Sequence, residues 1–106
     1  MRITGKAVAY SVVLLVCSIT VHAAPQGDRL YAAHCAACHG ETGSGGVGVP
    51  LSLPSFLDGV DDEFLRITIR QGRPGRVMPA FNSLSDAQVN AIVRHLRSWS
   101  DKPAPT

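Results

Sequence analysis

The chain has 106 residues, of which 45% are hydrophobic and 17% are charged, with a formal net charge of +2 and three cysteines. This length accommodates one domain. Arg2 and Lys6 lie in a segment that we expect to be removed, and the remainder then has equal numbers of basic and acidic residues. Its charge gives no indication of nucleic-acid binding.

The first 23 residues have the pattern of a secretory signal. Arg2 and Lys6 precede an uncharged apolar run over 7–21, and Val21-His22-Ala23 offers a small-residue cleavage site. A helix over 7–21 would be about 22 Å long, which is short of the roughly 30 Å hydrocarbon core of a bilayer. We therefore expect residues 1–23 to be a signal peptide, which directs the protein to the bacterial periplasm.

Two alternatives to cleavage stay open. If the apolar run is extended to Ala24, it could serve as an uncleaved membrane anchor. The segment ending at Cys17 is similar to a bacterial lipidation signal, although Val16 departs from that pattern. With the signal removed, we expect one domain over 24–100, a flexible tail over 101–106, and peripheral or no membrane contact.

Three helices are predicted, in chain order, at 26–38, 61–71 and 85–100. The first has Pro25 ahead of it and Asp28 in its first turn, where an acidic side chain complements the helix dipole. The second begins at Asp61, a capping residue, and Gly72 can end it. No convincing strand pattern is present. The sequence thus predicts an all-α class.

The third helix has the strongest signals. Ser85 and Gln88 form a capping-box pattern, and apolar residues from Val89 to Trp99 repeat at helical spacing. Between the helices lie two long loops, 40–59 and 72–84. Loops of this length are unusual in a small domain unless something fills the middle.

The sequence CAACH at the end of the first predicted helix carries the clearest chemistry. On a helix Cys35 and Cys38 lie on one face, about 5–6 Å apart, so each can form a thioether bond with one vinyl group of a haem. His39 is then placed to be the proximal iron ligand. A thioredoxin-like pair would need a βαβ context, a zinc site would have to recruit His34 and His95, and a plain disulfide is the remaining alternative.

Met78 is the candidate for the sixth iron ligand. It is the only methionine once the signal is removed, and Pro79 after it favours a turn that projects the side chain. His/Met coordination raises the reduction potential of a haem. His34 and His95 are the rival ligands.

The run Gly43-Ser44-Gly45-Gly46-Val47-Gly48 matches the G-x-G-x-x-G pattern of dinucleotide-binding turns. That interpretation requires a preceding strand and a following helix, and neither is predicted. We expect instead a turn that carries the backbone away from the haem helix and past the porphyrin edge toward Pro50.

These motifs identify a resemblance to the class I c-type cytochromes, in particular the small single-haem bacterial type. The resemblance rests on Cys35–Gly40, Val77–Phe81 and Leu84–Gln88, and it covers Gly27 to Trp99. It implies a helical shell around one covalently attached haem c, with the first and last helices crossing at right angles. At that crossing, Gly27 and Tyr31 should meet Leu96 and Trp99.

The resemblance also implies roles for residues around the haem. A proline carbonyl should accept a hydrogen bond from His39, with Pro50 as the matching candidate and Pro54 as the alternative. Cationic side chains should hold the haem propionates. The candidates are Arg70, Arg73 and Arg76.

A haem with both axial positions filled by protein favours outer-sphere electron transfer over catalysis. The expected function is therefore a monomeric carrier that shuttles single electrons between redox protein partners. Arg73 and Arg76 would present positive charge to an acidic partner, while Asp58 to Glu63 form an acidic patch elsewhere. Two alternatives are a haem subunit of a periplasmic dehydrogenase or oxidase and, if Met78 does not bind iron, a sensor or peroxidase-like enzyme.

Overall fold

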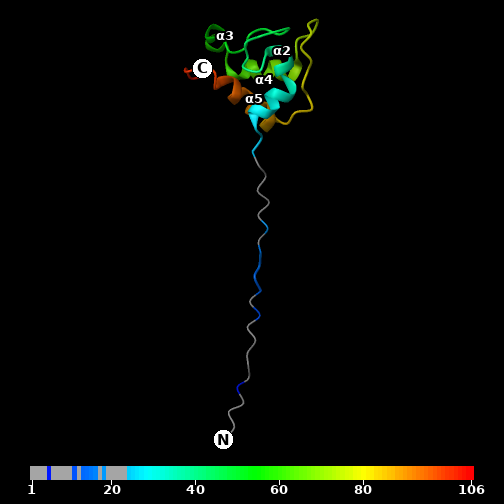
Figure 1. Cartoon of the computed structure of the whole chain (residues 1–106), viewed down its shortest axis with the longest axis vertical. Helices are drawn as coiled ribbons and strands as arrows, with labels where there is room; N and C mark the ends of the chain where they lie inside the picture. The colour runs from blue at the N-terminus through cyan, green and yellow to red at the C-terminus, as the bar shows by residue number, and fades with distance from the viewer. Residues whose placement is uncertain (1–4, 6–10, 12, 17, 19–23) are drawn as a thin grey trace.

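The computed structural model describes residues 5, 11, 13–16, 18 and 24–106 (Figure 1). The predicted cleavage site and Cys17 lie outside the described residues. Within the described part of the chain, no helix is both long and apolar enough to cross a membrane.

The described part of the chain contains five helices: α1 (Gly27–His34), α2 (Ala36–His39), α3 (Pro54–Gly59), α4 (Asp62–Gln71) and α5 (Asp86–Arg97). No strand occurs among the residues that the structure describes, and the predicted all-α class is confirmed. The predicted first helix is divided into α1 and α2, because the backbone at Cys35 departs from helical geometry with φ −119° and ψ −37°.

Helix α3 was not predicted, because the whole of 40–59 was expected to be a loop. Pro54 occupies its first turn, where the fixed φ of proline suits a helix and its missing N–H costs nothing. A helix this short is below the length at which apolar periodicity becomes visible in a sequence. It carries Phe56 and Leu57 toward the domain interior.

The ends of α4 and α5 follow the predicted capping chemistry. The carboxylate of Asp61 accepts a hydrogen bond from the backbone N–H of Phe64 at 2.7 Å. Ser85 and Gln88 form both bonds of the capping box. These caps fix where the two helices start, and the cap at Ser85 thereby marks the end of the segment that follows α4.

Helices α1 and α5 pack closely where they cross. A Cβ atom at Gly27 would lie 2.0 Å from the carbonyl oxygen of Ala91 and 3.2 Å from the Cβ of His95. Only glycine fits at this position. The predicted contact of Gly27 with Leu96 and Trp99 was therefore placed too far along α5, because Gly27 lies at the start of α1 and meets the middle of α5.

The other half of the predicted crossing is confirmed. The ring of Tyr31 lies 5.1 Å from that of Trp99 at an interplanar angle of 85°, an edge-to-face arrangement. Its hydroxyl donates a hydrogen bond to the carbonyl oxygen of Gly40 at 2.7 Å. His95 packs against both rings. Because Gly40 directly follows His39, this bond connects the crossing to the CAACH segment.

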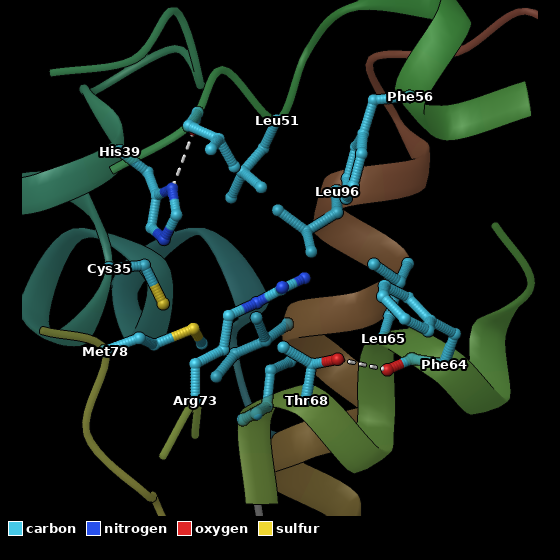
Figure 2. A pocket seen from close by; sticks show the side chains of 13 residues that line it. Cys35, His39, Leu51, Phe56, Phe64, Leu65, Thr68, Arg73, Met78 and Leu96 are labelled. Carbon is cyan, nitrogen blue, oxygen red and sulfur yellow. Dashed lines mark hydrogen bonds between the residues drawn. The ribbon is translucent and has the colours of Figure 1, made fainter. Parts of the chain in front are cut away.

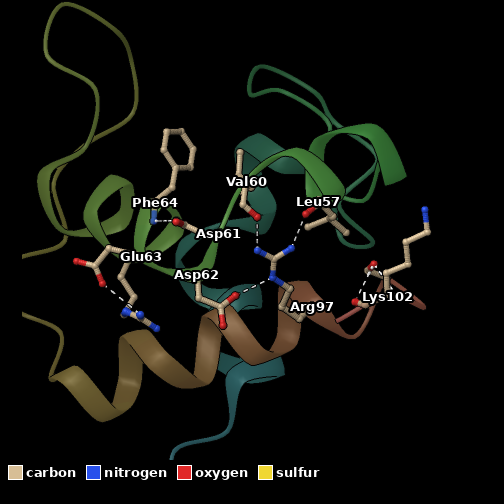
Figure 3. Close-up of polar contacts among 10 residues, drawn as sticks. Leu57, Val60, Asp61, Asp62, Glu63, Phe64, Arg97 and Lys102 are labelled. Atoms are coloured by element: carbon tan, nitrogen blue, oxygen red, sulfur yellow. Dashed lines mark hydrogen bonds and ion pairs between the residues drawn. The ribbon is translucent and has the colours of Figure 1, made fainter. Parts of the chain in front are cut away.

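The buried core lies between α1, α4 and α5. Its members are Tyr31, Leu65, Ile69, Leu84, Val89, Ile92, Val93 and Leu96. A second connection is made by Arg97, which bonds to the carboxylate of Asp62 at 2.7 Å and to the carbonyls of Leu57 and Val60 (Figure 3). These bonds join the end of α5 to α3 and α4, which form one wall of the candidate site.

The C-terminal tail also contacts the domain. The ammonium group of Lys102 lies 3.1 Å from the carboxylate of Asp58. Exposed ion pairs of this kind contribute little to stability.

Candidate haem site

An apolar cavity opens between α2, α4, α5 and the segment that follows α4 (Figure 2). Most of its lining is aliphatic or aromatic, with Leu51, Phe56, Phe64, Leu65, Ile69, Ile92 and Leu96 contributing. The groups that can bond to a cofactor there are Cys35, His39 and Met78, and Arg73 adds a cation.

Neither of the two predicted attachment cysteines is part of a disulfide among the described residues. Cys35 lies at the break between α1 and α2 with its sulfur toward the cavity (Figure 2). Cys38 lines an adjoining apolar space, which Cys35, His39 and Met78 also line. Burial raises the pKa of the free Cys35 thiol to about 11, and the charge of Cys38 makes a smaller contribution in the same direction. The unattached thiol is therefore protonated at neutral pH.

His39 is held by one specific hydrogen bond. Its Nδ1 lies 2.8 Å from the carbonyl oxygen of Val49. Because a carbonyl oxygen can only accept, Nδ1 carries the proton, and Nε2 keeps its lone pair for a metal. The backbone N–H of Gly48 bonds to the carbonyl of Cys38 at 2.7 Å, which brings Val49 alongside the imidazole.

The hydrogen bond expected at the carbonyl of Pro50 thus falls one residue earlier. The chain turns away from His39 at Pro50. The next two backbone N–H groups, those of Leu51 and Ser52, both bond to the carbonyl of Gly43. The carbonyl of Val49 is the one left facing the histidine. Pro50 itself lines the outer, more open part of the site.

The glycine run surrounds His39 closely. A Cβ atom at Gly48 would lie 2.7 Å from both Cε1 and Nδ1 of the imidazole. The N–H of Gly45 bonds to the carbonyl of His39 at 2.8 Å. No strand precedes this run among the described residues, and no helix begins at its end. Its contacts are with the CAACH segment rather than with a dinucleotide-binding fold.

Met78 lines the same cavity as His39 and reaches it from the segment after α4 (Figure 2). The backbone N–H of Arg73 bonds to the carbonyl of Met78 at 3.1 Å. Gly72 has φ +64°, and a Cβ there would lie 2.7 Å from the Met78 carbonyl oxygen. This close approach brings the segment back against the end of α4.

The two rival histidines have different surroundings. His34 is exposed, and its ring packs against Phe81 at 5.7 Å. His95 lies at the crossing of α1 and α5, between Tyr31 and Trp99. Neither lines the apolar cavity between α4 and α5, whereas His34 does line the adjoining space of Cys38, His39 and Met78.

The three candidate arginines have different surroundings. Arg73 lines the cavity, and its guanidinium carbon lies 6.0 Å from the centre of the Phe64 ring. Arg76 lines the outer part of the site. Arg70 instead bonds to protein groups, the carbonyls of Phe81 and Leu84 and the carboxylate of Asp86. The guanidinium of Arg70 is therefore hydrogen-bonded to protein groups, a structural role that the sequence did not predict.

These residues fit a covalently bound haem. The two cysteines and His39, whose Nδ1 is hydrogen-bonded, lie on one short helical segment. The thioether of Met78 faces the same space. The surrounding apolar side chains suit a porphyrin, whose body is apolar. Thioether attachment through Cys35 and Cys38 and axial ligation by His39 and Met78 are chemistry that this donor set can support.

Comparison with known proteins identifies the family. The family model described as cytochrome c oxidase, cbb3-type, subunit III matches residues 22–96. Cytochrome c55X of Stutzerimonas stutzeri is 36% identical over 77 residues, which cover 72% of this chain and 67% of that protein. The solved structure of the KustC0563 c-type cytochrome superposes with a TM-score of 0.63 at 26% identity, covering 70% of this chain and 96% of that one.

A larger relative contains a similar domain. The dihydro-heme d1 dehydrogenase of Pseudomonas aeruginosa is 36% identical over 97 residues, which are 91% of this chain but 19% of that protein. The chain therefore spans about a fifth of that relative's length. It belongs to the family of the cbb3-type oxidase subunit III, and it is a class I c-type cytochrome domain that carries covalently bound haem c.

Proposed function

We propose that this chain is a periplasmic one-electron carrier in which Cys35 and Cys38 attach the haem and His39 and Met78 are the axial ligands. A haem iron with both axial positions filled supplies one-electron oxidation and reduction while offering no open position to a substrate. The observation that supports this proposal best is that His39, already oriented by Val49, and Met78 line one apolar cavity.

The surrounding residues have defined tasks in this proposal. The Val49 carbonyl holds the Nδ1 proton of His39 and so increases the basicity of the imidazole as a ligand. The apolar lining excludes water and keeps the local dielectric low, which is one of the protein's means of setting a reduction potential. Arg73, at the edge of the cavity, is placed to pair with a carboxylate such as a haem propionate.

Carbon monoxide binding tests whether Met78 occupies the sixth coordination position of the haem iron. The reduced wild-type holoprotein should bind carbon monoxide slowly and weakly, whereas Met78→Ala should bind it rapidly. His34→Ala is the matched control, since His34 is the other ligand candidate near the attachment site, and it should behave as wild type. Rapid binding by the wild-type protein would overturn the carrier proposal and favour a sensor or peroxidase-like function.

Arg73 and Arg76, which we call the arginine rim, are proposed to dock an acidic surface of a redox partner. Both are exposed at the outer part of the site, beside the 78% exposed side chain of Val77. Positive charge at this edge would accelerate encounter with an anionic partner and would be screened by salt.

Charge reversal tests the arginine rim. Arg73→Glu plus Arg76→Glu should slow oxidation of the reduced protein by ferricyanide at least about tenfold at low salt, with a smaller effect at high salt. Arg29→Glu plus Arg94→Glu changes the net charge equally at exposed positions on α1 and α5, and it should have a much smaller effect. Equal rates for the two double variants would disprove docking at the rim.

A second candidate function is a haem subunit within a periplasmic dehydrogenase or oxidase. It is favoured by the family description and by the match to a small part of a larger dehydrogenase. In that case the protein should co-purify from its native host with a much larger partner under mild conditions. Elution as a free monomer of the carrier's size would favour the first candidate.

The periplasmic location depends on the leader. We propose that residues 1–23 are removed on export, so the mature protein should begin at Ala24 or the residue after it. Intact-mass measurement of the protein from a periplasmic extract tests this directly. A mass that includes the leader, or a lipid, would instead indicate one of the two anchored forms.

A further inference from the structure

We propose that Arg70 is a positioning residue for Met78: its guanidinium fastens the segment between α4 and α5 and thereby keeps the Met78 thioether in the cavity. The inference rests on the proposed function, in which Met78 is the sixth iron ligand. Arg70 lies in the last turn of α4, directly ahead of that segment.

The segment from Gly72 to Ser85 has no helix to hold its shape. Met78 lies between two backbone attachments. On one side, the N–H of Arg73 bonds to the Met78 carbonyl at 3.1 Å; on the other, the N–H of Phe81 bonds to the carbonyl of Ile69 at 3.0 Å. The first attachment ends on Arg73, just after α4, and the second ends on Ile69, within α4.

Arg70 reinforces the second attachment. Nη1 donates to the carbonyl of Phe81 at 3.3 Å and to that of Leu84, and Nη2 donates to the carboxylate of Asp86 at 2.5 Å. The planar guanidinium presents its donors in a fixed geometry. One side chain therefore connects α4, the end of the Met78 segment and the first turn of α5.

The bonds to the two carbonyls should matter more than the ion pair. The side chain of Asp86 is 95% exposed, against 27% for Arg70, and solvent screens exposed pairs. The carbonyls receive charge-assisted bonds and would lose partners if Arg70 were removed. We therefore expect that neutralising Asp86 has a small effect on how firmly Met78 is held, and that removing the Arg70 side chain has a large one.

A role in holding Met78 is separable from a role in the core. Arg70 is not among the residues of the buried core, to which α4 contributes Leu65 and Ile69. Its removal should loosen the segment while leaving the packing of α4 on α5 in place. Met78 would then leave the iron more readily, and an added ligand would take its position.

Imidazole titration of the oxidised holoprotein measures how firmly Met78 is held. We expect Arg70→Gln to bind imidazole at least about tenfold more tightly than wild type, and Asp86→Asn to stay within about threefold. Arg66→Gln is the matched control, because Arg66 lies one turn earlier on α4 and pairs only with Glu63. It should stay within about twofold of wild type.

Arg70→Lys keeps the charge but loses the forked donor geometry, so its affinity should lie between those of wild type and Arg70→Gln. If Arg70→Gln does not fold, Arg70→Lys and Asp86→Asn carry the test, with Arg70→Lys expected to bind imidazole more tightly than Arg66→Gln. Titrations are made well below the unfolding temperature of each variant, so that a general loss of stability does not raise the affinity.

Met78→Ala separates the two proposals. If wild type binds imidazole as tightly as Met78→Ala, Met78 is not a ligand and the proposed function fails. If wild type binds much more weakly than Met78→Ala, but the Arg70 variants match Arg66→Gln, Met78 is a ligand and the positioning role of Arg70 is refuted.

Discussion

Gly27→Ala should destabilise the domain by acting on the crossing of α1 and α5. The new Cβ would lie 2.0 Å from the carbonyl oxygen and 2.7 Å from the carbonyl carbon of Ala91. Both are backbone atoms inside α5, so no flexible side chain can move aside. One helix must therefore shift away from the other, which also loosens the Tyr31–Trp99 contact.

The size of the effect follows from two opposing terms. Overpacking a close contact costs about 1–3 kcal/mol, and a contact with rigid backbone belongs at the upper end. Replacing glycine by alanine in a helix recovers about 0.5–1 kcal/mol. The net loss in the free energy of unfolding is about 2 kcal/mol, which lowers the melting temperature of a domain of this size by about 8–16 °C.

Thermal unfolding of the holoprotein, followed by circular dichroism, measures this loss. Gly59→Ala is the matched control, because nothing lies within 4 Å of a Cβ at the last residue of α3. Its melting temperature should equal or slightly exceed that of wild type. If Gly27→Ala melted together with Gly59→Ala, the crossing would not be as tightly packed as we describe.

Three further predictions concern attachment, pH and capping. Cys35→Ser plus Cys38→Ser should yield protein that is unfolded and without covalent haem, and a cooperative helical domain by circular dichroism would contradict this. Burial raises the pKa of Tyr31 to about 12; a free Cys35 thiol adds a smaller increase, and a backbone hydrogen bond lowers it. Since the folded-state pKa is the higher one, stability should fall as pH rises from about 10 to 12. Denaturant titrations should show that Tyr31→Phe lacks this part of the fall, and an unchanged alkaline profile would refute it. Asp61→Ala should cost about 1 kcal/mol in the same assay through the lost cap, and no loss would show that the cap is not needed.

The parts of the site that could be predicted depend on residues that lie close together in the sequence. Cys35, Cys38 and His39 form one motif whose spacing carries its chemistry, and Met78 is the only methionine besides Met1. Capping residues at Asp61 and Ser85 indicate helix starts through side-chain bonds that span only three residues. Such short-range signals need no knowledge of how the chain folds back.

The parts that were wrong or missed depend on contacts between distant segments. Whether Val49 or Pro50 accepts the bond from His39 is decided by the path of the chain, which Gly43 sets by bonding the residues after Pro50. The partners of Arg70 lie 11 to 16 residues further along the chain. An arginine close to a haem motif is easily interpreted as a propionate ligand until those carbonyls are seen beside it.

In the proposed function, His39 and Met78 together occupy both axial positions of the haem iron. The absorption spectrum of the oxidised holoprotein tests it most directly, because coordination of a methionine sulfur to ferric haem gives a weak far-red band. We predict this band in the wild-type protein, its loss in Met78→Ala and its retention in His34→Ala. A wild-type spectrum without the band, or a band that survives in Met78→Ala, would contradict the account.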